Sequence, residues 1–161
     1  MVIWSQGFSP LEKFIVPFTK VVIHTVWAVK DRKPLMSKLQ KESICQHIRE
    51  YAASKNIHIL NINGYREHLH CLFSLASEQN IATVMNLIKG ESSHWANKNL
   101  QFIERFGWQD EYFAVSVSKS HISQVVDYIN NQEEHHKKKT FGEEYNEFIK
   151  KFDFEMEGLK P

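Results

Sequence analysis

The segment IHILNINGYREHLHCLFSL, residues 57–75, decides the fold. It contains two runs rich in branched and aromatic residues, 57–65 and 68–75, which meet at the turn-forming group Gly64-Tyr65-Arg66-Glu67. Two such runs with a short turn between them are typical of a β-hairpin. We therefore predict two neighbouring antiparallel strands in this segment.

The sequence on either side of the hairpin extends this pattern. Residues 19–30, TKVVIHTVWAVK, predict a buried strand that ends at a DRKP turn, and residues 35–56 predict a helix with one apolar stripe. After the hairpin we expect a helix, a short strand, a second helix and a weaker amphipathic segment, at residues 81–98, 112–117, 121–138 and 143–154. The order β-α-β-β-α-β-α predicts an α+β fold of the ferredoxin-like split βαβ type, with one additional C-terminal helix that carries Tyr128.

The composition indicates one globular domain. The chain has 161 residues, of which 42% are hydrophobic and 24% are charged. We expect an N-terminal extension, a single folded domain and a C-terminal tail, at residues 1–18, 19–140 and 141–161. Cys45 and Cys71 form no CxxC pair, which argues against a disulfide scaffold and against a thiolate zinc site. No apolar run approaches the roughly 20 residues of a membrane span, so we expect a cytoplasmic protein without a membrane partner.

The net charge of +1 is too small to indicate binding to duplex DNA by itself. The charge is unevenly distributed, however. Residues 19–41 hold six basic side chains and one acidic side chain, whereas residues 143–157 hold six acidic side chains and two lysines. Any contact with nucleic acid is therefore expected from a local basic region.

A His-x-His pair lies in the second strand of the predicted hairpin. Strand alternation places His68 and His70 on one face and Leu69 and Cys71 on the other. Side chains two residues apart on a strand lie about 7 Å from each other, and two imidazoles at this spacing can bind one metal ion. A chain with nine histidines can also contain such a pair by chance, so the pair alone leaves a purely structural role open.

The predicted helix over residues 121–138 carries two further candidates. Its apolar stripe consists of Ile122, Val125, Val126 and Ile129. Tyr128 and Gln132 lie one turn apart on a flank of this stripe, about 40° from each other in projection. A phenol and an amide oxygen could border one site, and an amide oxygen suits Mg²⁺ or Mn²⁺. Alternatively, Tyr128 lies at the core edge and Gln132 is solvated.

Five motifs in a fixed order together carry a family resemblance across residues 19–139. They are VVIHTVWAVKDRKP, HLH, LIKGESS, WQDEYFAVSVS and a helix with the pattern Y-x-x-x-Q. In these motifs the chain resembles the single-tyrosine HUH transposases of small bacterial insertion sequences and their domesticated relatives. The resemblance implies that His68, His70 and Gln132 bind the metal ion and that Tyr128 is the nucleophile.

The resemblance also implies an activity. We expect a metal-dependent endonuclease and strand-transferase that acts on single-stranded DNA with hairpin ends, through a covalent 5′-phosphotyrosine and with Mg²⁺ or Mn²⁺ as cofactor. The expected assembly is a homodimer whose tyrosine helix can serve the partner's site, with residues 116–121 as a hinge. Lys30, Arg32 and Lys89 match basic positions of the family and are expected to bind DNA. Glu67 is either a group that supports the first histidine or a turn residue.

Other conspicuous side chains have simpler explanations. Trp27 and Trp95 have the spacing of core residues more than of base-stacking platforms, and His24 is expected to be buried and hydrogen-bonded. The run from His135 to Lys139 places cations at the end of a helix, where they interact favourably with the helix dipole.

Two other functions remain as alternatives. A ferredoxin-like module could bind single-stranded nucleic acid without catalysis, through exposed aromatic side chains. This alternative gives no role to the His-x-His pair or to the Y-x-x-x-Q pattern. A replication initiator or relaxase of the HUH class would require further domains beyond these 161 residues.

Overall fold

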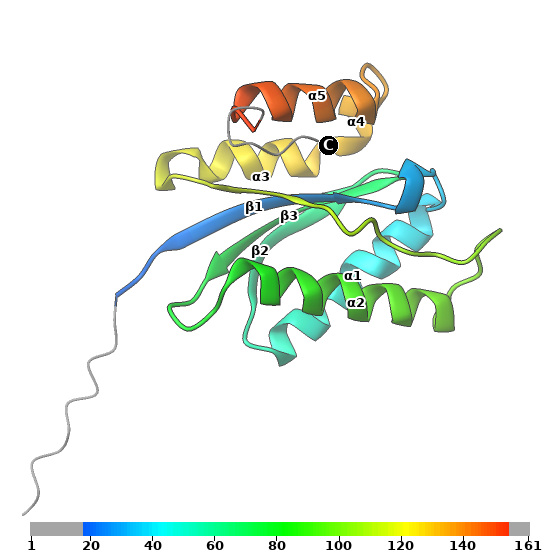
Figure 1. The fold of residues 1–161 in the computed structure, drawn as a ribbon, viewed down its shortest axis with the longest axis horizontal. Helices are drawn as coiled ribbons and strands as arrows, with labels where there is room; N and C mark the ends of the chain where they lie inside the picture. The colour runs from blue at the N-terminus through cyan, green and yellow to red at the C-terminus, as the bar shows by residue number, and fades with distance from the viewer. Residues whose placement is uncertain (1–17, 155–161) are drawn as a thin grey trace, which may run out of the picture.

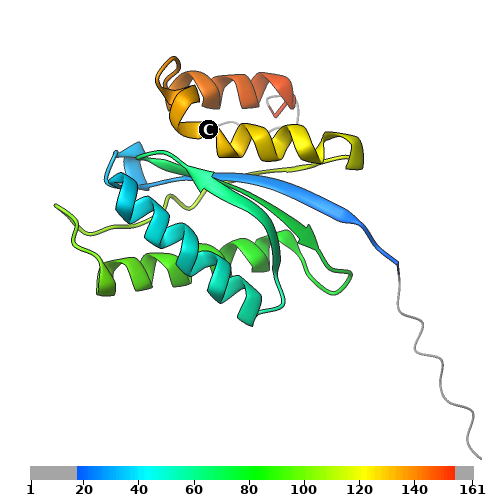
Figure 2. The same ribbon diagram turned by 180° about the vertical axis from the view of Figure 1, so that it is seen from behind.

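A four-stranded antiparallel sheet with helices on both faces forms the protein (Figures 1 and 2). The computed structural model describes residues 18–154. The strands are β1 (Val21–Ala28), β2 (His58–Gly64), β3 (His68–Leu75) and β4 (Phe113–Ser116). One face is covered by α1 (Lys38–Ser54) and α2 (Ile81–Asn99), and the other by α3 (Ile122–Asn130), α4 (Gln132–His136) and α5 (Phe141–Lys151). Two short 3₁₀ turns, η1 (Lys30–Arg32) and η2 (Lys119–His121), follow β1 and precede α3.

The strand order confirms the predicted ferredoxin-like fold. The order is β2-β3-β1-β4, and each neighbouring pair is antiparallel. Helix α1 links β1 and β2, which have β3 between them, and α2 links β3 and β4, which have β1 between them. This is the split βαβ arrangement. The predicted hairpin is β2 and β3, in which Gly64 pairs with Leu69.

Strand β3 is buried on both faces and separates two sets of side chains. Leu69, Cys71 and Phe73 belong to the main core, which packs against α1 and α2. Leu72 belongs to a smaller cluster with Ile129 of α3, on the opposite face. The alternation along the strand therefore places His68 and His70 beneath the C-terminal helices, away from the main core.

Side-chain caps define where the helices on both faces begin. Ser37 accepts a hydrogen bond from the backbone N–H of Gln40, and the Gln40 side chain accepts one from the backbone N–H of Ser37. Thr140 and Glu143 form the same reciprocal pair at the start of α5. Such capping boxes satisfy backbone donors that have no partner inside the helix. The second box fixes the start of α5.

The single helix predicted for residues 121–138 is wrong, because the chain forms α3 and α4 with a break at Asn131. Asn131 has φ −93° and ψ 19°, and its side-chain amide donates to the carbonyl of Asp127 at 2.9 Å. Asparagine favours such local bonds over continued helix. The amphipathic segment predicted at residues 143–154 is the helix α5. Except for Phe18, the predicted N-terminal extension lies outside the described residues.

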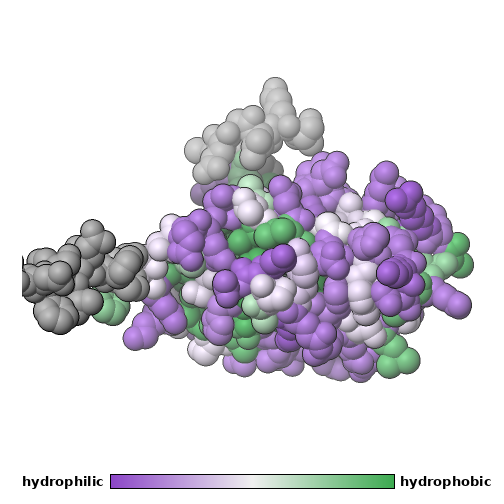
Figure 3. Space-filling model, turned by 90° about the horizontal axis from the view of Figure 1, so that it is seen from below, coloured by the Kyte–Doolittle hydropathy of each residue, from purple (hydrophilic) through white to green (hydrophobic). Residues whose placement is uncertain are grey.

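The face formed by α1 and α2 is mainly hydrophilic, with small separate hydrophobic areas (Figure 3). Leu39 and Ile103 are among the large apolar side chains that are exposed. Within residues 18–154, no helix is both long enough and apolar enough to span a bilayer.

Gly64 lies so close to the neighbouring strand that no Cβ atom fits there, which leads to a stability prediction. A Cβ atom at this position would lie 2.1 Å from the carbonyl oxygen of His68 and 2.8 Å from the Cα of Leu69. Gly64→Ala should therefore lower the free energy of unfolding by about 1–3 kcal/mol, the usual effect of overpacking. Gly90, within α2, has no atom within 4 Å of its added Cβ, so Gly90→Ala should raise stability by about 0.5–1 kcal/mol. Urea unfolding measures both, and equal effects in the two variants would contradict this account.

Candidate functional site

Three histidines from β1 and β3 meet on the sheet face below α3, α4 and α5. His68 and His70 are fully buried on β3, and His24 on β1 is 5% exposed. The strand register pairs His70 with Val26 and His68 with Ala28. His24 Nε2 lies 3.1 Å from His70 Nδ1, which confirms the expectation that His24 is buried and hydrogen-bonded.

Tyr128 is positioned by hydrogen bonds between α3 and β2. The Asn61 side chain donates to the carbonyl of Val126 at 3.2 Å, and the Asn63 side chain donates to the carbonyl of Ile129 at 3.0 Å. These two bonds fix the last turns of α3 on the sheet. The Tyr128 ring centre then lies 5.5 Å from that of His70, in an edge-to-face arrangement. Tyr128 therefore lies beside the histidine pair of its own chain.

Gln132 begins α4 and points its side chain into the same site. It is fully buried, and its Oε1 lies 3.1 Å from His68 Nε2. Its Nε2 donates to the carbonyl of Tyr128 at 3.4 Å, which fixes the amide orientation because the opposite orientation would place two oxygens together. The structure thus brings together Tyr128, His68, His70 and Gln132.

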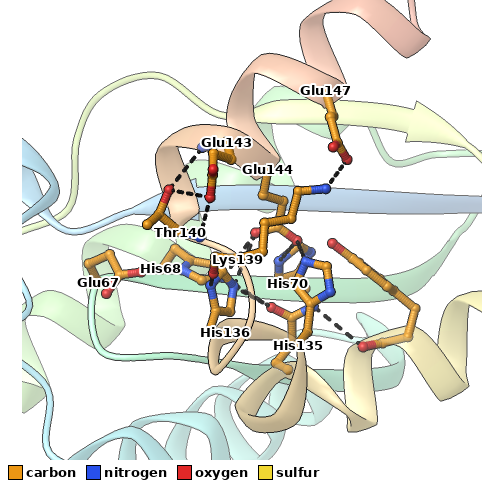
Figure 4. A network of polar contacts seen from close by, with 12 residues as sticks. Glu67, His68, His70, His135, His136, Lys139, Thr140, Glu143, Glu144 and Glu147 are labelled. Atoms are coloured by element: carbon orange, nitrogen blue, oxygen red, sulfur yellow. Dashed lines mark hydrogen bonds and ion pairs between the residues drawn. The ribbon is translucent and has the colours of Figure 1, made fainter.

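A buried carboxylate and two histidines complete this cluster, and sequence reasoning missed all three. Figure 4 shows Glu144 of α5 reaching down between the imidazoles of His68 and His70 and those of His135 and His136. Its carboxylate oxygens lie 3.2–3.6 Å from an Nε2 atom of each ring. Glu144 is 2% exposed. His136 lies in the last turn of α4, as predicted, but its side chain is 2% exposed and burial lowers its pKa to about 4, so it is not a helix-end cation at pH 7.

Helical spacing contained a signal for these residues. Phe141, Glu144, Tyr145 and Phe148 follow the i, i+3, i+4, i+7 pattern of a buried stripe, and Glu144 is the charged member. His136 lies four residues after Gln132. A carboxylate within an apolar stripe indicates a buried polar partner.

Burial changes the protonation of the cluster. Removal from water lowers the pKa of His24 to about 3 and that of His136 to about 4, and it lowers the pKa of His70 well below its ordinary value. Removal from water also raises the pKa of Glu144 to about 7. The imidazoles of His24, His70 and His136 are therefore neutral at pH 7. They supply no positive charge to the Glu144 carboxylate.

The donor atoms of the cluster fit a metal ion. Donor atoms of His68, His70 and Glu144 all lie within 4.8 Å of one another. His68 Nδ1 is 3.1 Å from the Glu67 carboxylate, which can only accept, so its proton is on Nδ1 and the Nε2 lone pair faces the cluster. Within residues 18–154, His70 Nε2 and both Glu144 oxygens have no hydrogen-bond partner. Buried lone pairs without a donor are costly, and a cation would satisfy them.

Of the expected DNA-binding residues, two are engaged by the protein itself. Arg32 lies over the ring of Tyr145, 4.0 Å from its centre. The Lys89 amine donates to the carbonyl of Asp110 at 2.6 Å, and partial burial lowers the pKa of this amine. Lys30 is exposed in η1. These three residues lie outside the histidine cluster.

The tryptophans predicted to be core residues are part of the core. Trp27 is 1% exposed, and Trp95 packs against the same core cluster and stacks on His47. Trp108 is 8% exposed, and its indole N–H donates to Ser92.

Two hollows in the surface meet at Tyr128. One has a volume of about 670 Å³ and lies beside α4, and the other has a volume of about 620 Å³ and extends between α3 and α5. Tyr128 and His135 line both hollows, and Glu144 and His24 line the second. The tyrosine is therefore reachable from outside although the histidine cluster behind it is buried.

A family comparison matches residues 17–132 to the model described as "Transposase IS200 like". The chain belongs to the IS200-like transposase family. The matched region extends from β1 to Gln132 and includes His68, His70 and Tyr128. Residues from Glu133 onward, and so His136 and Glu144, lie beyond it.

Individual transposases of this family are similar in sequence and in structure. The transposase of insertion sequence IS200 from Salmonella typhimurium is 24% identical over 119 residues, which cover 71% of this chain and 78% of that protein. The ISDra2 transposase TnpA from Deinococcus radiodurans is 24% identical over 114 residues, which cover 68% and 81%.

Two solved structures share the fold. A Deinococcus radiodurans R1 protein assigned as a transposase matches 72% of this chain and 93% of its own, with a TM-score of 0.58 and 18% identity. A REP-associated tyrosine transposase bound to a REP hairpin matches 74% of this chain and 71% of its own, with a TM-score of 0.58 and 16% identity.

Proposed function

We propose that this IS200-like transposase is a metal-dependent endonuclease and strand-transferase that acts on single-stranded DNA through Tyr128. One observation carries the proposal. An accessible phenol lies at the junction of two hollows, directly beside a buried cluster of His68, His70 and Gln132 that fits a divalent ion. A nucleic-acid-binding module without catalysis would have no use for this cluster.

His68, His70 and Gln132 would hold the ion. Imidazole nitrogens and an amide oxygen are ligands suited to Mn²⁺, and the amide oxygen also suits Mg²⁺. Glu67 supports His68, because it accepts from Nδ1 and so fixes the ring and its tautomer. When bound, the ion would polarise the scissile phosphate and stabilise the charge that develops on it.

Tyr128 would cleave the strand by attack of its phenolic oxygen on phosphorus. A bond forms between this oxygen and phosphorus, and the bond between phosphorus and the 3′ oxygen breaks. The phenol gives up its proton and the released 3′ oxygen takes one up, so that the products are a 5′-phosphotyrosine and a free 3′-OH. Attack by another 3′-OH reverses the step and joins a new strand without an external energy source.

The substrate that we propose is single-stranded DNA next to a hairpin. The REP-associated relative binds a REP hairpin, and it shares this fold. Lys30, Arg32 and Lys89 are proposed to contact phosphates, since basic side chains provide most of the affinity for nucleic acid. Arg32 and Lys89 would exchange their contacts with Tyr145 and Asp110 for DNA.

Replacement of the nucleophile gives the first functional prediction. Incubation with Mn²⁺ and a hairpin oligonucleotide should attach the protein covalently to the 5′ side of the cut, and Tyr128→Phe should abolish this adduct. Denaturing gel electrophoresis with a labelled strand measures it. Tyr65→Phe is the matched control, because Tyr65 stacks on His136 near the site and should not be needed for the adduct. An adduct that persists in Tyr128→Phe would show that another residue is the nucleophile.

Removal of a metal ligand should separate cleavage from binding. His70→Ala should reduce cleavage by at least about 100-fold, the scale of lost charge stabilisation at an active site, while hairpin affinity changes little because backbone contacts need no ion. Gln132→Ala should have a smaller effect, since water can replace a neutral ligand. Cleavage rate and hairpin affinity are measured on the same samples. Parallel loss of both in His70→Ala would instead assign this residue a structural role.

We further propose that the protein works as a homodimer, because exchange of two DNA ends requires two active sites in one complex. The position of Tyr128 beside its own histidines, with α3 bonded to Asn61 and Asn63, supports use of the tyrosine within one chain. Use of the partner's site would require α3 to break these hydrogen bonds, with residues 116–121 as the hinge.

A subunit-mixing experiment decides between these two modes. Tyr128→Phe and His68→Ala proteins, each inactive alone, should remain inactive after mixing if each chain uses its own tyrosine. The expected cleavage in mixed dimers is therefore below about 1% of wild type, as for loss of an essential group. Differently tagged subunits confirm that heterodimers have formed. Recovery to a quarter or more of wild-type cleavage would show that the site is shared between subunits.

A further inference from the structure

We propose that helix α5 completes the metal centre: Glu144 and His136 bind the ion together with His68, His70 and Gln132, and the site prefers Mn²⁺ to Mg²⁺. Both added residues lie beyond the matched family region. This inference rests on the metal centre of the proposed function and deepens it, because it assigns two ligands and a class of metal.

His136 presents a lone pair to the centre of the cluster. Its Nδ1 lies 2.9 Å from the backbone carbonyl of Lys139, which can only accept, so Nδ1 carries the proton. Its Nε2 is then unprotonated and lies 3.1 Å from Gln132 Oε1 and 3.2 Å from Glu144 Oε2. A backbone carbonyl that fixes the outer nitrogen of a ligating imidazole is a common feature of metal sites.

Two imidazole nitrogens and two side-chain oxygens face one another at the centre of the cluster. They are His68 Nε2, His136 Nε2, Gln132 Oε1 and Glu144 Oε2, and each nitrogen lies 3.1–3.6 Å from both oxygens. Ligands about 2.1 Å from one ion are about 3.0 Å apart at octahedral angles and about 3.4 Å apart at tetrahedral angles. These nitrogen–oxygen separations match those between neighbouring ligands of one ion.

The charge of the cluster also indicates a cation. Within the part of the chain that the structure describes, the basic groups within 4 Å of the Glu144 carboxylate are four imidazoles. A buried carboxylate costs free energy unless a positive charge lies nearby. A divalent ion would supply that charge.

Packing alone does not explain a carboxylate at this position. Glu144 lies on the inward stripe of α5 between Phe141 and Phe148, where an apolar side chain would fill the same space. The capping box of Thr140 and Glu143 starts α5 so that Glu144 falls in the first turn, facing the sheet. The acidic residue of the next turn, Glu147, is exposed and pairs with Lys139.

The ligand chemistry sets the preference among metals. Three imidazole nitrogens with one carboxylate and one amide oxygen form a mixed set that first-row transition ions accept. Mg²⁺ favours oxygen ligands and retains several waters, which a nearly fully buried cluster cannot hold. The centre should therefore bind Mn²⁺ at least about 10-fold more tightly than Mg²⁺, the direction expected for such a donor set.

Metal titration of the purified full-length protein tests the inference without reference to DNA cleavage. Isothermal titration of metal-free protein with Mn²⁺ measures affinity, and the visible absorption of added Co²⁺ reports the ligands. Glu144→Gln keeps the shape of the side chain and removes its charge, so it should weaken Mn²⁺ binding by about 10- to 100-fold and alter the Co²⁺ spectrum. His136→Asn should also weaken binding. Glu147→Gln, one turn along the same helix, should leave affinity and spectrum unchanged.

The outcomes separate this inference from the proposed function. Unchanged Mn²⁺ affinity and an unchanged Co²⁺ spectrum in Glu144→Gln would overturn the inference that Glu144 binds the ion. If this variant also cleaved DNA faster, the carboxylate would instead block the position of the phosphate. Equal effects of Glu144→Gln and Glu147→Gln would overturn the inference as well. Wild-type affinity in His68→Ala would instead remove the metal centre of the proposed function itself. Circular dichroism shows that each variant is folded, and Glu144→Asp, with a shortened carboxylate, should give an intermediate affinity.

Discussion

A buried set of nitrogen and oxygen lone pairs above β3 constrains how the C-terminal helices are arranged. The Nε2 atoms of His68 and His136 lie 3.1–3.6 Å from side-chain oxygens of Gln132 and Glu144. Three of these side chains are oriented by hydrogen-bond partners outside the cluster: Glu67 for His68, the Lys139 carbonyl for His136 and the Tyr128 carbonyl for Gln132. Such a set is unfavourable in a dry interior unless a cation joins it. An ion bound at these atoms would therefore also join α4 and α5 to the sheet (Figure 4).

The two faces of the sheet have different roles, one in the main core and one in the candidate site. One face of β3 packs with α1 and α2 into the main core, while the other face carries the histidines and is closed by α3, α4 and α5. Tyr128 depends on this second layer, because Asn61 and Asn63 of β2 hold the end of α3. Ferredoxin-like folds have many unrelated functions. In this protein the layer of α3, α4 and α5 contributes Tyr128, Gln132 and Glu144 to the cluster.

Segments far apart in the sequence also meet around α5. The basic stretch after β1 contributes Arg32, which lies over Tyr145, and the acidic C-terminal segment contributes Glu144 to the histidines. One residue of the basic region thus packs on the acidic C-terminal helix. The family match ends at Gln132, whereas the buried cluster includes Glu144, which lies beyond the matched region.

The sequence by itself determined the features that depend on local periodicity. Alternation in HLHCLFSL placed His68 and His70 on one face, and the turn at Gly64 fixed the hairpin, because neighbours along a strand set both. The order of elements then left the ferredoxin-like topology as the expected fold. Only the tertiary structure decided the break at Asn131 and the entry of His136 and Glu144 into the site. Helical spacing shows which face a side chain is on, but it does not show which buried groups lie opposite that face. Which buried groups face α5 depends on how this helix packs on a sheet whose strands come from distant parts of the sequence.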